Sequence, residues 1–273
     1  MKPLKHGGGA VRHVTPHGPF LGLVGVLTLL AVLDRGGDLG AVGWAVGLAC
    51  GVALCVLLGA GLVRASRPRL LPADRVTLSR AVLVCGVAAL VADTVAQPAG
   101  THETTGVLVA LAAVALVLDA VDGRVARRTG TVHPLGARFD METDAFLILV
   151  LSAYVARDLG WWVMGVGAAR YLLLLVALAA RWAPWLRGQV PALLWRKVVA
   201  AYQGIVLTVA AAGILPAAVA SLAVGTGLGL LAVSFGTEIV TLRRLSLPRP
   251  TEVETLAAWP GVGPSAVDAR VLP

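Results

Sequence analysis

The chain of 273 residues is 58% hydrophobic and only 14% charged, and its mean hydropathy is +0.83. These values exclude an ordinary soluble globular domain and indicate an integral membrane protein. The formal net charge of +8 falls mostly in short polar stretches between hydrophobic runs. That distribution is typical of membrane topology, so we expect no nucleic-acid partner.

Eight hydrophobic runs approach or reach the roughly 20 helical residues that cross a hydrocarbon core of about 30 Å. They predict an all-α fold of eight transmembrane helices, over approximately residues 19–33, 40–63, 76–96, 105–121, 136–156, 161–180, 198–215 and 217–240. The first run is short and follows a basic tail, as in a signal peptide, but no small-residue cleavage site follows it. We therefore expect this run to be a retained helix.

The distribution of lysine and arginine predicts the orientation, because these residues in short loops stay on the cytosolic side. All but three of the 23 fall on the same side of the predicted spans; Arg35 and Arg157 fall on the other side, and Arg170 lies within a span. With eight spans, both termini are then cytosolic. The prediction is a multi-pass protein of the plasma (cytoplasmic) membrane.

Four aspartates stand out where the sequence reads DAVDGRVARRTGTVHPLGARFDMETD. Asp119 and Asp122 are three residues apart at the end of the fourth predicted span, and Asp140 and Asp144 are four apart near the start of the fifth. Each pair therefore occupies one face of its helix. The short turn makes the two helices antiparallel neighbours, so we expect the four carboxylates to converge at the cytosolic face. Ionisable side chains at membrane depth indicate a functional site.

The chemistry of this stretch indicates a metal and a phosphate. Carboxylate oxygens bind hard divalent cations, and Mg²⁺ typically combines a few carboxylates with substrate phosphates. Two ions about 3.5–4 Å apart would bridge a pyrophosphate and stabilise its entering and leaving oxygens. Gly123 and Gly136 leave room for a nucleotide against the helices, and Arg127 offers donors suited to phosphate. We predict a site for two Mg²⁺ or Mn²⁺ ions.

This pattern, D-x2-D-G-x2-A-R-x8-G-x3-D-x3-D, resembles the signature of the CDP-alcohol phosphotransferase (CDP-alcohol phosphatidyltransferase) family. The resemblance implies a core of six helices and transfer of a substituted phosphate group from a CDP-alcohol to an acceptor hydroxyl, with release of CMP. It further implies that Asp119, Asp122 and Asp140 hold the metal ions, and that Asp144 is the general base and touches a second metal. The remaining matched positions, expected near the CDP and its phosphates, are Gly123, Ala126, Arg127 and Gly136.

A weaker likeness precedes the third predicted span, where LPADRVTLSR is similar to the family's opening Pro-Asn-x-x-Thr-x-x-Arg element, with Ala73 in place of Asn. By this likeness Thr77 and Arg80 are further candidates for CDP or phosphate binding.

A second weak likeness concerns the acceptor. The segment RKVVAAYQG resembles an element of phosphatidylglycerophosphate synthases but keeps only its Lys197 and Gln203, so a glycerol-phosphate acceptor is not implied. The same subgroup has an intramembrane arginine at the position of Arg170. Arg170 and Lys197 are therefore candidate contacts to the acceptor or to a phosphate. Glu142 is expected to pair with Arg138, four residues earlier, and to face away from the site.

The predicted organisation has three parts: a basic tail with two extra helices (1–70), a six-helix catalytic core (71–244) and a loose cytosolic tail (245–273). The expected partners are membrane lipid, a CDP-alcohol donor, which by family likeness is CDP-diacylglycerol, and a hydroxyl acceptor in phospholipid biosynthesis. The acceptor's identity, the role of the extra helices and the assembly of a homodimer stay open.

Two other functions share some of these features. A Mg²⁺-dependent membrane prenyltransferase also binds a pyrophosphate through aspartates, but its two motifs lie on distant helices. A cation transporter places carboxylates in a helical bundle, yet near the midplane and often beside broken helices. The position of these aspartates at one membrane face favours the phosphate site.

Overall fold

The computed structural model describes residues 17–37, 39–64, 72–96, 105–129, 134–179 and 194–246. The described chain is all-helical, and each of the eight predicted runs corresponds to one α-helix. Of the two predicted tails, the structure describes only residues 17 and 18, which begin the first helix, and 245 and 246, which end the last one. The elements are α1 (His17–Arg35), α2 (Ala41–Arg64), α3 (Pro72–Ala96), α4 (Thr105–Thr129), α5 (Pro134–Leu159), the short 3₁₀ helix η1 (Trp161–Val163), α6 (Met164–Ala179), α7 (Leu194–Ala211) and α8 (Ala217–Ser246).

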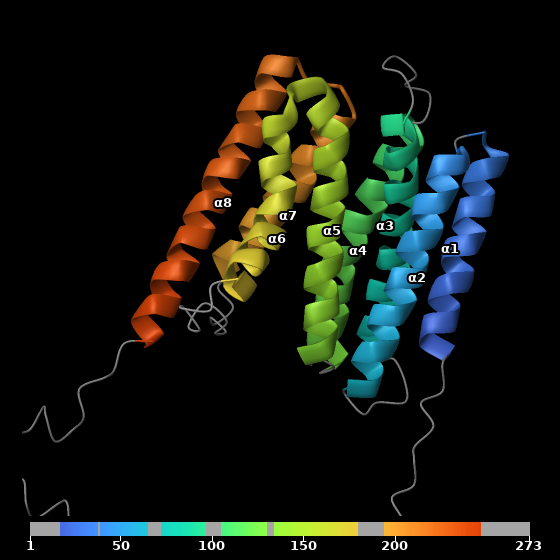
Figure 1. Ribbon diagram of the computed structural model, residues 1–273, viewed down its shortest axis with the longest axis horizontal. Helices are drawn as coiled ribbons and strands as arrows, with labels where there is room; N and C mark the ends of the chain where they lie inside the picture. Colours follow the sequence, from blue (N-terminus) through green and yellow to red (C-terminus); the bar gives the residue numbers. More distant parts are fainter. Residues whose placement is uncertain are drawn as a thin grey trace, which may run out of the picture.

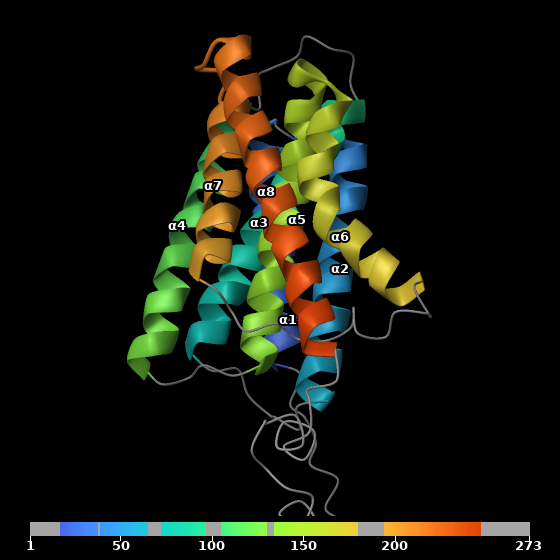
Figure 2. The same cartoon turned by 90° about the vertical axis from the view of Figure 1, so that its left-hand side faces the viewer.

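Successive helices alternate in direction, so that α1, α3, α5 and α7 begin at the same end of the bundle at which the other four helices end (Figures 1 and 2). We call this the basic end, because several described cations lie within two turns of the helix ends there: Arg64, Arg75, Arg124, Arg138 and Lys197. The opposite end, which we call the far end, carries Arg35 and Arg157.

Helix α3 lies at the centre of the bundle. Of its most apolar 18-residue stretch 72% is buried, against 22% in α1, α2 and α8. It packs against α1 and α2 on one side and against α4 and α5 on the other, and α5 in turn packs against α6 and α7. The helices α6, α7 and α8 consequently lie on the side of α5 away from α1 (Figure 1). This arrangement brings residues of α3, α4 and α5 together at the basic end.

The two N-terminal helices dock closely onto α3. Gly43 and Gly47 of α2 lie one turn apart, and a Cβ built on them would meet the Ala89 carbonyl oxygen at 3.0 Å and the Ala89 Cβ at 3.1 Å, respectively. Small residues at this spacing let membrane helices approach closely. The pair is therefore packed into the same bundle as the helices that follow it.

A buried carboxylate completes this contact at the far end. Asp93 of α3 accepts hydrogen bonds from the backbone N–H of Gly40 (2.9 Å) and of Gly43 (3.3 Å), at the first turn of α2. The first N–H groups of a helix have no partner within the helix, and its N-terminus favours a negative charge. Asp93 thus caps α2 from a neighbouring helix.

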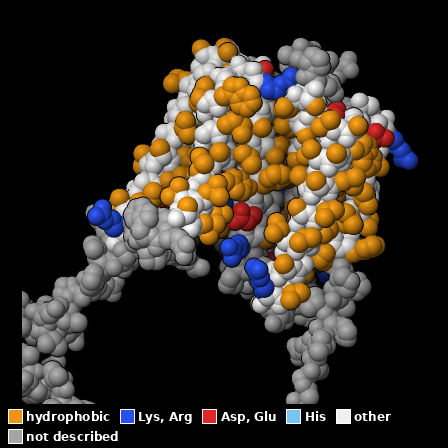
Figure 3. Space-filling view, in the orientation of Figure 1, with side chains coloured by type: hydrophobic (Ala, Val, Ile, Leu, Met, Phe, Trp, Pro, Cys, Tyr) orange, Lys and Arg blue, Asp and Glu red, His pale blue; other side chains and the backbone are white. Residues whose placement is uncertain are grey.

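Within the described residues, four helices are long and apolar enough to cross a membrane, over Gly18–Arg35, Ala41–Arg64, Asp74–Ala96 and Ala217–Arg243. Shorter apolar stretches occur over Thr105–Val121, Trp161–Val176 and Lys197–Ala211. Helices α4 and α5 have less apolar length because charged residues occupy their basic ends. Hydrophobic side chains cover most of the flank seen in Figure 3, and charged ones gather toward the two ends. These features indicate a multi-pass membrane protein.

Candidate active site

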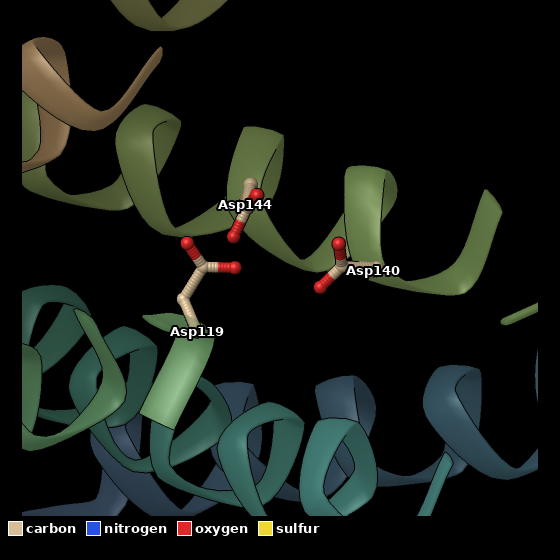
Figure 4. Close-up of side chains that lie close together, drawn as sticks. All are labelled: Asp119, Asp140 and Asp144. Atoms are coloured by element: carbon tan, nitrogen blue, oxygen red, sulfur yellow. The ribbon is translucent and has the colours of Figure 1, made fainter. Parts of the chain in front are cut away.

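Three of the four predicted aspartates meet at the basic end of the bundle. Asp119 extends from α4 toward Asp140 and Asp144, which lie one turn apart on α5 (Figure 4). Each offers a carboxylate oxygen within 4.8 Å of the others. The convergence expected from the spacing of these residues is confirmed for these three.

Arg80 of α3 joins the three carboxylates. Its side chain is only 1% exposed, whereas those of the aspartates are about one third exposed. One terminal nitrogen donates to Asp119 Oδ1 at 2.5 Å. The other donates to a carboxylate oxygen of Asp140 and to its backbone carbonyl at 3.2 Å, and lies 3.0 Å from Asp144 Oδ1. The planar guanidinium suits this role, because it presents several donors in a fixed fork.

Arg80 belongs to a buried polar face of α3. Asp74, Thr77 and Arg80 are spaced three residues apart, so they lie on one side of the helix, and all three are buried. Asp74 did not emerge from the sequence reasoning. Counting back from Thr77, however, the Asn position of the family's opening element falls on Asp74 rather than on Ala73. A carboxylate therefore stands where that element has a carboxamide.

The other signature residues are placed less completely. Gly123 lies one turn after Asp119 on α4, and Gly136 one turn before Asp140 on α5. Asp122, Ala126 and Arg127 belong to α4, but their side chains lie outside those that the structure describes. The contribution of these three side chains stays a prediction.

Arg170 on α6 is paired with Glu142 of α5, with 2.7 Å between the guanidinium nitrogen and Glu142 Oε1. The expected pairing of Glu142 with Arg138 is therefore wrong. The reason is tertiary packing: α5 and α6 lie side by side, and a Cβ on Gly167 would come within 2.6 Å of the Leu149 Cα. That close contact brings Arg170, one turn after Gly167, to the face of α5 that carries Glu142.

The two candidate residues of α7, Lys197 and Gln203, differ in their exposure and in their contacts. Lys197 is exposed at the basic end and close enough for its charge to act on the Asp140 carboxylate. Gln203 is buried, and its amide donates to the carbonyl oxygen of Gly227 on α8 at 2.8 Å. Gln203 thus joins two helices. Of these two α7 residues, only Lys197 carries a charge that acts on the aspartates.

The donor set fits a hard divalent cation. Three carboxylates contributed by two helices supply oxygen ligands only, which is the chemistry that Mg²⁺ and Mn²⁺ prefer. Their partial exposure leaves access for a phosphate ligand from the basic end. Backbone and side-chain geometry are thus consistent with a metal site of the kind that the sequence predicted.

Comparison with known proteins agrees with this geometry. The family described as CDP-alcohol phosphatidyltransferase matches residues 70–236, well over half of the chain. The protein therefore belongs to the CDP-alcohol phosphatidyltransferase family, whose members are integral membrane enzymes that transfer a substituted phosphate group from a CDP-alcohol and release CMP. Searches of curated proteins and of solved structures returned no match. The prenyltransferase and transporter alternatives are set aside by this membership.

Proposed function

We propose that the protein transfers a phosphatidyl group from CDP-diacylglycerol to the hydroxyl of an acceptor, at the cytosolic face of the plasma membrane. Family membership gives the class of reaction, and the observation that carries the proposal is the convergence of Asp119, Asp140 and Asp144 at one end of a lipid-facing bundle. A donor with acyl chains would reach such a site from the membrane. Its nucleotide would be exchanged with the cytosol.

The four aspartates have two proposed roles, metal binding and proton transfer. Asp119, Asp122 and Asp140 would hold two Mg²⁺ or Mn²⁺ ions, which would neutralise charge on the pyrophosphate. Asp144 accepts the proton of the acceptor hydroxyl, because an alcohol becomes a better nucleophile as its proton is removed. Asp144 lies one turn from Asp140 and is partly exposed, which suits a group that must reach a substrate.

The acceptor would lie toward α6 and α7. Lys197 is exposed at the basic end, where its charge acts on Asp140, and it is available for an anionic group of the donor or acceptor. Arg170 is held by Glu142 one helix away, so its charge is already partly compensated. The acceptor contacts are therefore expected to depend more on Lys197 than on Arg170.

The topology proposed for this function has eight spans, with both termini and the basic end in the cytosol. Basic residues are concentrated at that end of the bundle, as expected for the cytosolic side. The six helices α3 to α8 form the catalytic core, and α1 with α2 forms an added pair packed against α3.

The function is tested by measuring CMP released from CDP-diacylglycerol by the purified protein with Mg²⁺ or Mn²⁺, against a panel of acceptor alcohols. Release should require the metal and one acceptor of the panel. Asp144→Asn should lower the rate by at least about 100-fold while the protein stays folded. Normal turnover in that variant would remove Asp144 from the mechanism. Absence of CMP release with every CDP-alcohol tried would refute the proposed function.

A further inference from the structure

Arg80 is the one described cation in direct contact with all three clustered aspartates. It comes from α3, whereas its partners come from α4 and α5, so it links three helices at the basic end. A buried guanidinium normally requires such partners, because transfer of an isolated charge out of water is very unfavourable. The three carboxylates satisfy that requirement together.

The charges within this group do not balance. One guanidinium faces three carboxylates, so these four side chains carry a net negative charge when all are ionised. Like charges within a few ångströms repel each other strongly where water is limited. The group therefore retains a strong attraction for a further cation, even with Arg80 in place.

A divalent ion ligated by these carboxylates would be repelled by Arg80 in its present position. The guanidinium nitrogens lie within 3.0 Å of one oxygen of each carboxylate. A divalent ion held by the same three carboxylates would therefore lie close to the guanidinium. The divalent ion and the guanidinium repel each other at such short range, so each weakens the hold of the carboxylates on the other.

We propose that Arg80 is the resident counter-ion of the aspartate cluster and competes with the divalent metal for it. This inference rests on the proposed function only in taking a divalent cation as the ligand. Arg80 holds Asp119, Asp140 and Asp144 together across α4 and α5, and the metal must displace it from at least one carboxylate. Arg80 is thus a positioning residue that lowers metal affinity while keeping the ligands assembled.

The competition has a direct consequence for the substrate. A guanidinium released from the carboxylates stays at the edge of the same site, because its backbone is fixed in the central helix α3. There its donors suit phosphate oxygens. Metal binding and the readiness of Arg80 to receive an anionic substrate would then occur together.

The test is the affinity of the full-length, chelator-treated protein for Mn²⁺, measured by electron paramagnetic resonance of the free ion. Arg80→Gln keeps hydrogen-bonding ability and removes the charge, and it should bind Mn²⁺ about tenfold more tightly than the unaltered protein. Arg75→Gln is the matched control, because Arg75 is exposed on the same helix five residues earlier. It should bind like the unaltered protein.

Thermal unfolding of the same samples gives a second readout. Without metal, Arg80→Gln should unfold at a lower temperature than the unaltered protein, since the carboxylates lose their counter-ion. Mn²⁺ should raise its unfolding temperature by more than that of the unaltered protein. If Arg80→Gln fails to fold, Arg80→Lys serves instead: it keeps one positive charge without the fork, and should show a smaller gain in Mn²⁺ affinity.

Equal or weaker Mn²⁺ binding by the Arg80 variants would overturn the competition, as would no Mn²⁺ binding by either the variants or the unaltered protein. Failure of the proposed function is distinguishable, because it would appear as absent CMP release in protein that still binds Mn²⁺ with the predicted order of affinities.

Discussion

The two ends of α3 hold buried charge in opposite ways. At the far end, Asp93 is satisfied by backbone N–H groups of Gly40 and Gly43, which are fixed by the start of α2. At the basic end, Arg80 is paired with three side chains that are each about one third exposed, and it also donates to the backbone carbonyl of Asp140. A charge bound to backbone amides has partners that cannot be exchanged. A charge bound to partly exposed carboxylates has partners that a metal ion can bind in its place.

This contrast suggests that the buried charge of Asp93 is structural and that the buried charge of Arg80 is functional. Buried polar groups without partners are very unfavourable inside a bilayer, so the buried charges at both ends of α3 need hydrogen-bonding or ionic partners. At the basic end, three carboxylates share the one described guanidinium that contacts all of them, whereas at the far end a single carboxylate is held by backbone N–H groups. Substitution of Asp93 should therefore affect mainly stability, whereas substitution of a clustered aspartate should affect mainly turnover.

The largest effect is expected from Asp140→Asn. CMP release should fall by at least about 100-fold, because an amide is a poor replacement for a carboxylate ligand and for the charge that binds the metal. The free energy of unfolding should change by less than about 1 kcal/mol, since Arg80 keeps two carboxylates and the crowding of negative charge is reduced. Activity and thermal unfolding are measured on the same preparation. Asp158→Asn, an exposed aspartate at the far end, is the matched control.

Asp93→Ala should show the opposite pattern. It removes the acceptor of two backbone N–H groups at the start of α2, which is expected to lower the free energy of unfolding by about 1–3 kcal/mol. Turnover per folded molecule should stay within about twofold of the unaltered protein, because the site lies at the other end of the bundle. Asp158→Ala should leave both properties unchanged. Lost turnover with unchanged stability in Asp93→Ala would contradict the division between the two ends.

Some features of the fold and of the site follow from local sequence alone. The eight helices and the meeting of Asp119 with Asp140 and Asp144 depended on local rules: hydrophobic length, helical spacing and a short turn between two helices. Such features are contained in a few tens of consecutive residues. They were therefore predicted correctly, although in the part of the chain that the structure describes only four helices are long and apolar enough to span a membrane by themselves.

The partners of Arg80, Asp93 and Glu142 required the packing of helices distant in sequence. Asp119 lies 39 residues from Arg80, and Gly40 lies 53 residues from Asp93. Which faces of two helices meet depends on close contacts along their whole length. A backbone N–H, moreover, leaves no mark in the sequence, so the cap on α2 had no signal. For Glu142 the local partner was plausible, and a tertiary one was found.

The α5–α6 contact gives a smaller and more local effect. A Cβ on Gly167 would meet the Leu149 Cα at 2.6 Å and Ser152 at 2.9 Å, so Gly167→Ala must separate the two helices. We expect a loss of about 1–3 kcal/mol in stability. Gly165→Ala is the matched control on the same helix, since its Cβ would meet Leu228 at an ordinary 3.6 Å. Equal stability of the two variants would show that α6 adapts without loss.

The smallest effect is expected for the pair of Glu142 and Arg170, whose side chains are 43% and 33% exposed. Exposed ion pairs typically contribute about 0.2–1 kcal/mol and weaken with salt. A double-mutant cycle of Glu142→Gln with Arg170→Gln should therefore give a coupling in that range, measured by thermal unfolding at low salt. The same cycle with Arg138→Gln should give almost none, although Arg138 is the nearer residue in sequence. Coupling of Glu142 to Arg138 and not to Arg170 would contradict the observed pair. It would mean that Glu142 pairs within α5 and not across the contact with α6.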